Sequence, residues 1–184
     1  MKKELLIMFF IGFAFNISAQ SVDPLIAKDA EAQTIWVDSI MKNMTLDEKI
    51  GQLFMVQAYS NKDEKHAEFI TEMIKEYHVG NLIFMQGTPE KQAELNNRYQ
   101  DAAKVPLMIG FDGEWGLDMR LKNTYRFPWN MTLGAIRNDS LIKEFGVHLG
   151  KHCKRLGIHI NFAPVVDINT NPANPIIGNR SFGE

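Results

Sequence analysis

The stretch "VGNLIFMQGTPEKQAELNNRYQDAAKVPLMIGFD", residues 79–112, decides the fold prediction. Two short apolar runs, residues 81–85 and 105–111, flank a polar segment of helical composition. Thr88 followed by Pro89 is typical of a helix start, because proline in the first turn removes no intrahelical hydrogen bond. Short continuous apolar runs are typical of parallel strands buried on both faces. The stretch therefore predicts a strand, a helix and a second strand.

The same alternation continues upstream. Residues 62–80 repeat apolar side chains at helical spacing and end at a glycine; the positions are Ala67, Ile70, Ile74, Tyr77 and Gly80. The apolar run at residues 52–58 fits either a strand or the end of a buried helix. Thr45 and Glu48 have the spacing of a capping box. Residues 34–44 carry a weaker helical stripe, so one more helix is expected there.

Downstream, residues 139–157 predict a helix that is capped by Asp139 or Ser140 and ended by Gly157. Residues 158–169 predict the next strand and its exit. Alternating helices and strands predict a parallel α/β sheet, either doubly wound or a (β/α)₈ barrel. No glycine-rich phosphate-binding sequence follows a strand, which weakens a nucleotide-binding interpretation. A complete barrel needs about 250 residues. The expected fold is therefore the N-terminal half of a (β/α)₈ TIM barrel, in a piece of a longer protein.

Composition and the N-terminus predict an exported protein. Lys2 and Lys3 precede an apolar run at residues 5–15, so residues 1–19 are expected to be a signal peptide, with an uncleaved anchor as the alternative. Residues 20–33 are expected to be a linker and residues 34–184 the partial barrel. The protein is then periplasmic or secreted, with no membrane contact after cleavage. The net charge of −2, with both signs interspersed, gives no reason to expect nucleic-acid binding.

Unusual residues follow the predicted strands. Asp112 ends one strand, Glu114 and Trp115 come directly after it, and Asp167 and Arg180 follow the last strand. Ligands bind at the carboxyl ends of parallel strands, so these residues are the candidate site. A carboxylate accepts hydrogen bonds from neighbouring sugar hydroxyls, and an arginine offers a planar fork of donors. The Trp115 ring offers a face for sugar stacking. The alternative is a structural ion pair between Asp112 and Arg180.

The sequence gives weaker support for a metal site or for an acid and base pair. His148 and His152 have the spacing of zinc ligands on a helix, but Leu149 stands where a metalloprotease places its general base, so no metal or other cofactor is expected. His159 alternates with isoleucines and is expected to point under the helices. Asp112 and Glu114 lie two residues apart and should diverge, which makes them a poor acid and base pair for sugar hydrolysis.

Four stretches resemble the N-terminal half of the glycoside hydrolase family 3 catalytic barrel, in its β-N-acetylhexosaminidase branch. They are "MTLDEKIGQLFMV" (44–56), "VPLMIGFDGEWGLDMR" (105–120), "FPWNMTLGAIRN" (127–138) and "GIHINFAPVVDINTNPANPIIGNRSFGE" (157–184). The resemblance implies a retaining, metal-independent β-glycosidase that releases terminal N-acetylhexosamine from glycans or peptidoglycan fragments. The alternatives are a family 3 β-glucosidase or xylosidase, and a non-catalytic sugar-binding remnant.

The resemblance also implies roles for individual residues. Asp112 and Arg180 match the family's sugar contacts, while Glu114, Trp115 and Asp167 are expected to support the pocket. The usual motif of the family at this position is Asp-x-Glu-Gly-Gly, so Trp115 replaces a glycine at a tight turn. The family's Lys-His pair, His–Asp loop and nucleophilic aspartate have no match before the end of the sequence. No catalytic residue is therefore expected in these residues, and this chain alone is expected to be inactive.

Overall fold

The computed structural model describes residues 28–183, so the predicted signal peptide and residues 20–27 of the predicted linker lie outside the described residues. The described residues fall into two compact units, residues 28–39 and 40–183. Helix α1 (Ala30–Met41) begins four residues earlier than expected, so residues 30–33 of the predicted linker are helical. The Ala32 amide donates to Asp29 Oδ1 at 2.9 Å, which satisfies a free amide of the first turn. No residue of α1 is buried.

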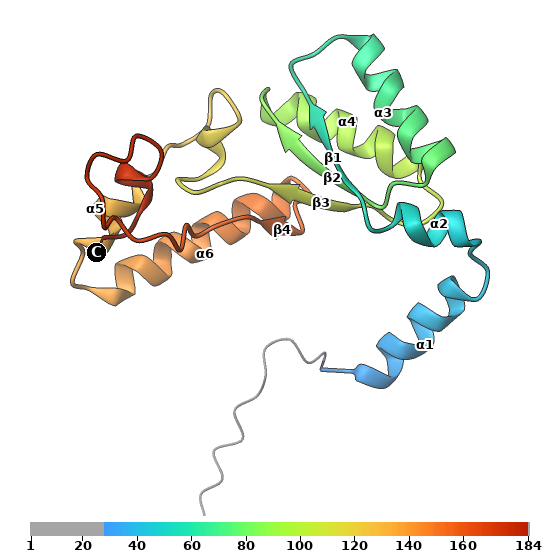
Figure 1. Ribbon diagram of the computed structural model, residues 1–184, viewed down its shortest axis with the longest axis horizontal. Helices are drawn as coiled ribbons and strands as arrows, with labels where there is room; N and C mark the ends of the chain where they lie inside the picture. The colour runs from blue at the N-terminus through green and yellow to red at the C-terminus, as the bar shows by residue number, and fades with distance from the viewer. Residues whose placement is uncertain (1–27, 184) are drawn as a thin grey trace, which may run out of the picture. The chain divides into compact units, whose positions relative to one another are not determined.

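Four parallel strands form one sheet in the order β1-β2-β3-β4 (Figure 1). They are β1 (Met55–Tyr59), β2 (Asn81–Met85), β3 (Met108–Phe111) and β4 (Ile160–Asn161). The sequence order equals the spatial order, so each strand pairs with the next one along the chain. The predicted parallel sheet is confirmed. In the run at residues 52–58, residues 55–58 belong to strand β1 and residues 52–54 form the turn before it.

Three helices connect the strands: α3 (Glu64–Tyr77), α4 (Pro89–Ala102) and α6 (Asp139–Arg155). All three contribute to one core together with the same face of the sheet, through Ile70, Leu82, Tyr99, Ile109 and Leu149 among others. Figure 1 shows α3 and α4 beside β1 and β2, and α6 beside β3 and β4. A doubly wound sheet would carry helices on both faces. In a (β/α)₈ barrel the helices cover only the outer face of the sheet, as they do here. Four of the eight strands are described, so the barrel is not closed.

The opposite face of the sheet would line the barrel interior, and it is only partly covered. Leu82 and Phe84 are fully buried, whereas Asn81, Ile83 and Met85 alternate with them and are half-buried. The expectation that the strands are buried on both faces is therefore wrong for β2, because the rest of the barrel wall that would enclose this face is not among the described residues, whereas in β3 the consecutive residues Ile109, Gly110 and Phe111 are all buried. A Cβ on Gly110 would lie 2.8 Å from the Phe162 ring and 3.1 Å from Met55 Sδ, so these side chains begin an interior layer.

Local signals account for most helix ends. Helix α2 (Leu46–Gly51) begins with the predicted capping box: the Glu48 amide donates to Thr45 Oγ1 at 3.2 Å, and the Thr45 amide donates to Glu48 Oε2 at 2.7 Å. The cap of α6 is Asn138, not Asp139 or Ser140, since Asn138 Oδ1 accepts from the Ser140 amide at 3.1 Å. Three further elements were not predicted: η1 (Leu117–Met119), α5 (Asn130–Gly134) and η2 (Gly178–Arg180).

His159 does not lie under the helices, as the alternation had suggested. Its side chain is exposed, and its Nδ1 accepts a hydrogen bond from the Ile109 amide at 3.0 Å. The imidazole therefore satisfies a main-chain donor of β3 near the start of β4. A histidine at this position stabilises the strand pairing rather than the core.

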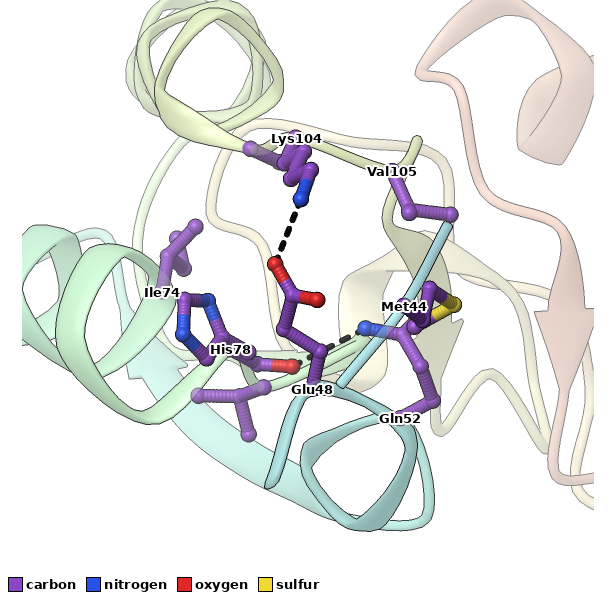
Figure 2. Close-up of a pocket in the computed structure, with 9 residues that line it drawn as sticks. Met44, Glu48, Gln52, Ile74, His78, Lys104 and Val105 are labelled. Carbon is purple, nitrogen blue, oxygen red and sulfur yellow. Dashed lines mark hydrogen bonds and ion pairs between the residues drawn. The ribbon is translucent and has the colours of Figure 1, made fainter. Parts of the chain in front are cut away.

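The amino-terminal end of the sheet is closed by a polar contact between α2 and the segment after α4. Figure 2 shows Lys104 reaching Glu48, with Nζ and Oε1 2.6 Å apart, and Gln52 Nε2 donating to the His78 carbonyl at 2.9 Å. The cavity among these residues has a volume of about 20 Å³, enough for about one water molecule. This end of a barrel contributes stability rather than ligand binding.

The ion pair between Lys104 and Glu48 predicts that the free energy of unfolding depends on pH. The hydrogen bond from Lys104, with that from the Thr45 amide, lowers the Glu48 pKa from 4.5 to about 2. A depressed carboxyl pKa contributes stability that is present above the unfolded value and is lost as the pH falls toward the folded value. In urea titrations, the stability difference between wild type and Glu48→Gln should therefore be largest at neutral pH and vanish as the pH approaches about 2.

The matched control is Glu94→Gln. Glu94 forms an exposed helix pair with Lys91 at 2.7 Å, and such pairs contribute little. Its stability difference should be small across the same pH range. A Glu48→Gln difference that is as large at the acid end as at neutral pH would contradict the prediction.

Candidate functional site

Asp112 lies at the carboxyl end of β3, on the inner face of the sheet. Ile109 and Phe111 point into the core, so Met108, Gly110 and Asp112 alternate to the other side. The Asp112 side chain is 22% exposed. The predicted acid is therefore held by a rigid strand end and faces the region that a complete barrel would enclose.

Arg120, which the sequence reasoning missed, is the partner of Asp112. Its Nη2 donates to Asp112 Oδ2 in a short ion pair. The Gly87 amide donates to the Arg120 carbonyl at 3.1 Å, so the exit of β2 fixes the main chain of this arginine. Among the described residues no other group bonds to the Asp112 carboxylate, which leaves Oδ1 free to accept. An arginine eight residues beyond the acid, in an irregular loop, gives no periodic signal in the sequence.

Arg180 binds Glu114 instead of Asp112. Its Nε donates to Glu114 Oε2 at 3.0 Å and its Nη2 donates to Oε1 at 2.7 Å, a bidentate pair across 66 residues of sequence. The Glu114 side chain is 4% exposed and that of Arg180 34%. The alternative ion pair between Asp112 and Arg180 is therefore wrong: each residue of that pair has another partner.

Two further acids of the candidate site, Asp112 and Asp167, act electrostatically on Arg180. The hydrogen bonds to Glu114 are the main cause of a raised Arg180 pKa, and the charges of Asp167 and Asp112 raise it further. Asp167 itself is exposed. Asp112, Glu114 and Asp167 therefore all act electrostatically on Arg180, and only Glu114 bonds to it.

The exits of β3 and β4 are tied together through Gly113. Its amide donates to Asn161 Oδ1 at 2.8 Å, and Asn161 Nδ2 donates to the Gly113 carbonyl at 3.4 Å. Gly113 separates the two acids, which bind different arginines. The expected divergence of Asp112 and Glu114 is consistent with this arrangement, since neither acid shares a partner with the other.

Trp115 packs inside the loop rather than standing alone. Its ring lies 4.4 Å from that of Trp129 between centroids, and the Arg126 guanidinium covers both rings at 5.3 and 4.6 Å. The departure from the Gly-Gly pattern has a simple explanation. Of the two residues Trp115 and Gly116, only Gly116 has a positive φ, +94°, and a Cβ there would meet the Phe127 ring at 2.8 Å. Trp115 therefore occupies the position that tolerates a side chain.

The described residues contain no candidate metal site and no membrane-spanning helix. Within residues 28–183 no group of three or more His, Cys, Asp and Glu side chains is placed to hold a metal ion. His152, one of the two spaced histidines, packs instead on the Phe127 ring, with centroids 6.0 Å apart. In the same part of the chain, every helix is too short or too polar to cross a bilayer.

Comparison with known proteins decides the family. A family model described as the glycosyl hydrolase family 3 N terminal domain matches residues 45–184. The chain belongs to glycoside hydrolase family 3. The match covers the sheet, its helices and every residue of the candidate site, and it confirms the family that the four sequence stretches indicated.

Two relatives and one solved structure illustrate the similarity. The β-N-acetylglucosaminidase/β-glucosidase of Cellulomonas fimi is 32% identical over 148 residues, which are 80% of this chain and 26% of the relative. β-Hexosaminidase A of Pseudoalteromonas piscicida is 35% identical, over 62% of this chain and 21% of the relative. The family 3 β-N-acetylglucosaminidase structure from Paenibacillus sp. str. FPU-7 superposes with a TM-score of 0.66 at 37% identity, over 76% of this chain and 28% of that one. The chain thus spans about a quarter of these proteins.

Proposed function

We propose that the full-length protein is a β-N-acetylhexosaminidase that releases terminal β-linked N-acetylhexosamine. One observation carries the proposal: Asp112 stands at the carboxyl end of β3, on the inner face, with Arg120 on one oxygen and the other oxygen free. An ionised carboxylate in this state accepts hydrogen bonds from sugar hydroxyls. Because Arg120 already holds it, little side-chain freedom is lost when the sugar binds.

In this proposal the described residues bind the sugar and do not perform the bond cleavage. Asp112 accepts from the hydroxyls, and Arg180 offers its partly exposed guanidinium from the next loop. Glu114, Trp115 and Asp167 support the loops that carry these two residues. The reaction is a double displacement through a covalent glycosyl-enzyme, with the nucleophile and the acid/base supplied by parts of the protein beyond these residues. No metal is needed for this chemistry.

The choice of sugar is tested with two substrates. The names of the two relatives above favour N-acetylhexosamine, and the name of the Cellulomonas fimi relative also includes β-glucosidase, which makes a β-glucosidase the second candidate. Turnover of an aryl N-acetyl-β-glucosaminide well above that of the matching aryl β-glucoside supports the first. The reverse preference supports the second, and no turnover of either by the full-length protein favours a non-catalytic sugar-binding protein.

The 184-residue chain by itself is predicted to show no glycosidase turnover. The described residues match the sugar contacts that the family resemblance implies, and the family's nucleophile and acid/base have no match among them. The purified chain and the full-length protein are compared on the same aryl N-acetyl-β-glucosaminide. Turnover by the chain alone, above background and at a rate near that of the full-length protein, would place the catalytic groups within these residues and refute the assignment.

The apolar run at residues 5–15 supports a further proposal, that the protein is exported to the periplasm or secreted. Peptidoglycan fragments and other glycans are the substrates that an enzyme in this location would meet. N-terminal sequencing of the mature protein tests the proposal, with cleavage expected after residue 19.

A further inference from the structure

Helix α5 packs directly against the segment that carries Arg180. Asn130, at its start, is 1% exposed, and its Nδ2 donates to the Arg180 carbonyl at 2.8 Å. Among the described residues Asn130 Oδ1 has no partner, so the side chain acts here as a donor. A buried amide with a single partner, 50 residues away, joins two loops that follow different strands.

The other end of α5 contacts the same segment. A Cβ on Gly134 would lie 1.9 Å from the Phe182 carbonyl oxygen, so only glycine allows this approach. Ser181, between the two contacts, is 1% exposed. Both ends of the helix therefore contact residues 180–182.

Arg180 is thus fixed at two places by one loop. Glu114 binds its guanidinium, and Asn130 binds its main-chain carbonyl. We propose that Asn130 is a positioning residue for sugar binding: it fixes the Arg180 main chain so that the guanidinium reaches Glu114 and the sugar together. The proposal rests on the proposed function of Arg180 as a sugar contact, and it gives a role to the "FPWNMTLGA" segment.

If Asn130 only stabilised the fold, replacing it would not change sugar binding. Asn96 is a buried asparagine that serves as the comparison. Asn96 on α4 is 7% exposed, its Nδ2 donates to the Leu156 carbonyl at 3.4 Å, and its Oδ1 also has no partner among the described residues. Leu156 belongs to the end of α6 and not to the candidate site. Both asparagines are therefore buried donors to a distant carbonyl, but only Asn130 acts on the arginine.

The experiment compares Asn130→Asp with Asn96→Asp in the full-length protein. Each change keeps the shape of the side chain and removes the donor. KM and kcat are measured on an aryl N-acetyl-β-glucosaminide, thermal midpoints are recorded, and deuterium uptake is followed in peptides covering residues 176–183. We expect both midpoints to fall. Only Asn130→Asp should raise KM, by about tenfold, because small misplacements of a binding group are costly. Only Asn130→Asp should speed exchange at residues 176–183.

The other outcomes separate the two proposals. Unchanged exchange at residues 176–183 in Asn130→Asp, or faster exchange with an unchanged KM, overturns the positioning role. An equal KM for Asn130→Asp and Asn96→Asp overturns it as well. If the wild-type protein turns over no glycoside, the proposed function fails, and faster exchange confined to Asn130→Asp then still shows that Asn130 fixes the Arg180 segment.

Discussion

Replacing Asp112 by alanine in the full-length protein is expected to lower kcat/KM on an aryl N-acetyl-β-glucosaminide by about a hundredfold or more. Hydrogen bonds to a charged group contribute about 1.5–3 kcal/mol each, and a carboxylate that accepts from two hydroxyls loses both. The change also leaves Arg120 without its ionic partner at the inner face. Steady-state kinetics and the affinity for free N-acetylglucosamine measure the loss.

Asp118→Ala is the matched control for Asp112→Ala. Asp118 lies in the same loop and also forms an ion pair, with Arg126 Nη1 at 3.2 Å from its Oδ2. Its partner covers the rings of Trp115 and Trp129 and does not contact Asp112. The control should keep kcat/KM within a few-fold of wild type. Near-wild-type kinetics for Asp112→Ala would remove Asp112 from the sugar site.

Replacing Arg180 by alanine is expected to cost both stability and sugar binding. Glu114, which is 4% exposed beside Arg180, would lose its ionic partner, and an uncompensated buried charge is strongly destabilising. Because the Arg180 side chain is 34% exposed, water reaches this position, and we expect about 2–3 kcal/mol, near the lower end for such changes. Chemical denaturation gives the stability, and titration with N-acetylglucosamine gives the binding loss.

The double variant Glu114→Gln/Arg180→Ala separates these two effects. A neutral glutamine does not need an ionic partner, so much of the lost stability should return. Sugar binding should stay weak, because the donor fork of Arg180 is still missing. Recovery of sugar affinity along with stability would mean that Arg180 acts only by neutralising Glu114.

Local sequence signals predicted the parts of the fold that depend on local forces. The capping box of Thr45 and Glu48 was correct because its partners are three residues apart. Strands β2, β3 and β4 and helices α3, α4 and α6 followed from apolar runs, apolar spacing and helix-start signals. Helix α5 was missed because a single turn held by contacts with residues 180–182 carries no period of its own. The start of α1 was misplaced because small and polar residues before it resemble a linker.

The alternating α/β order, the family and the set of unusual side chains at the strand ends were readable from the amino-acid sequence. It placed Asp112 and Arg180 in one site but suggested no partner other than each other. The pairing of Arg120 with Asp112 and of Arg180 with Glu114 became visible only in the folded chain. The physical reason is that any arginine in reach can pair with any acid. The choice depends on loop positions set by Gly87, Asn130 and Asn161 through contacts distant in sequence.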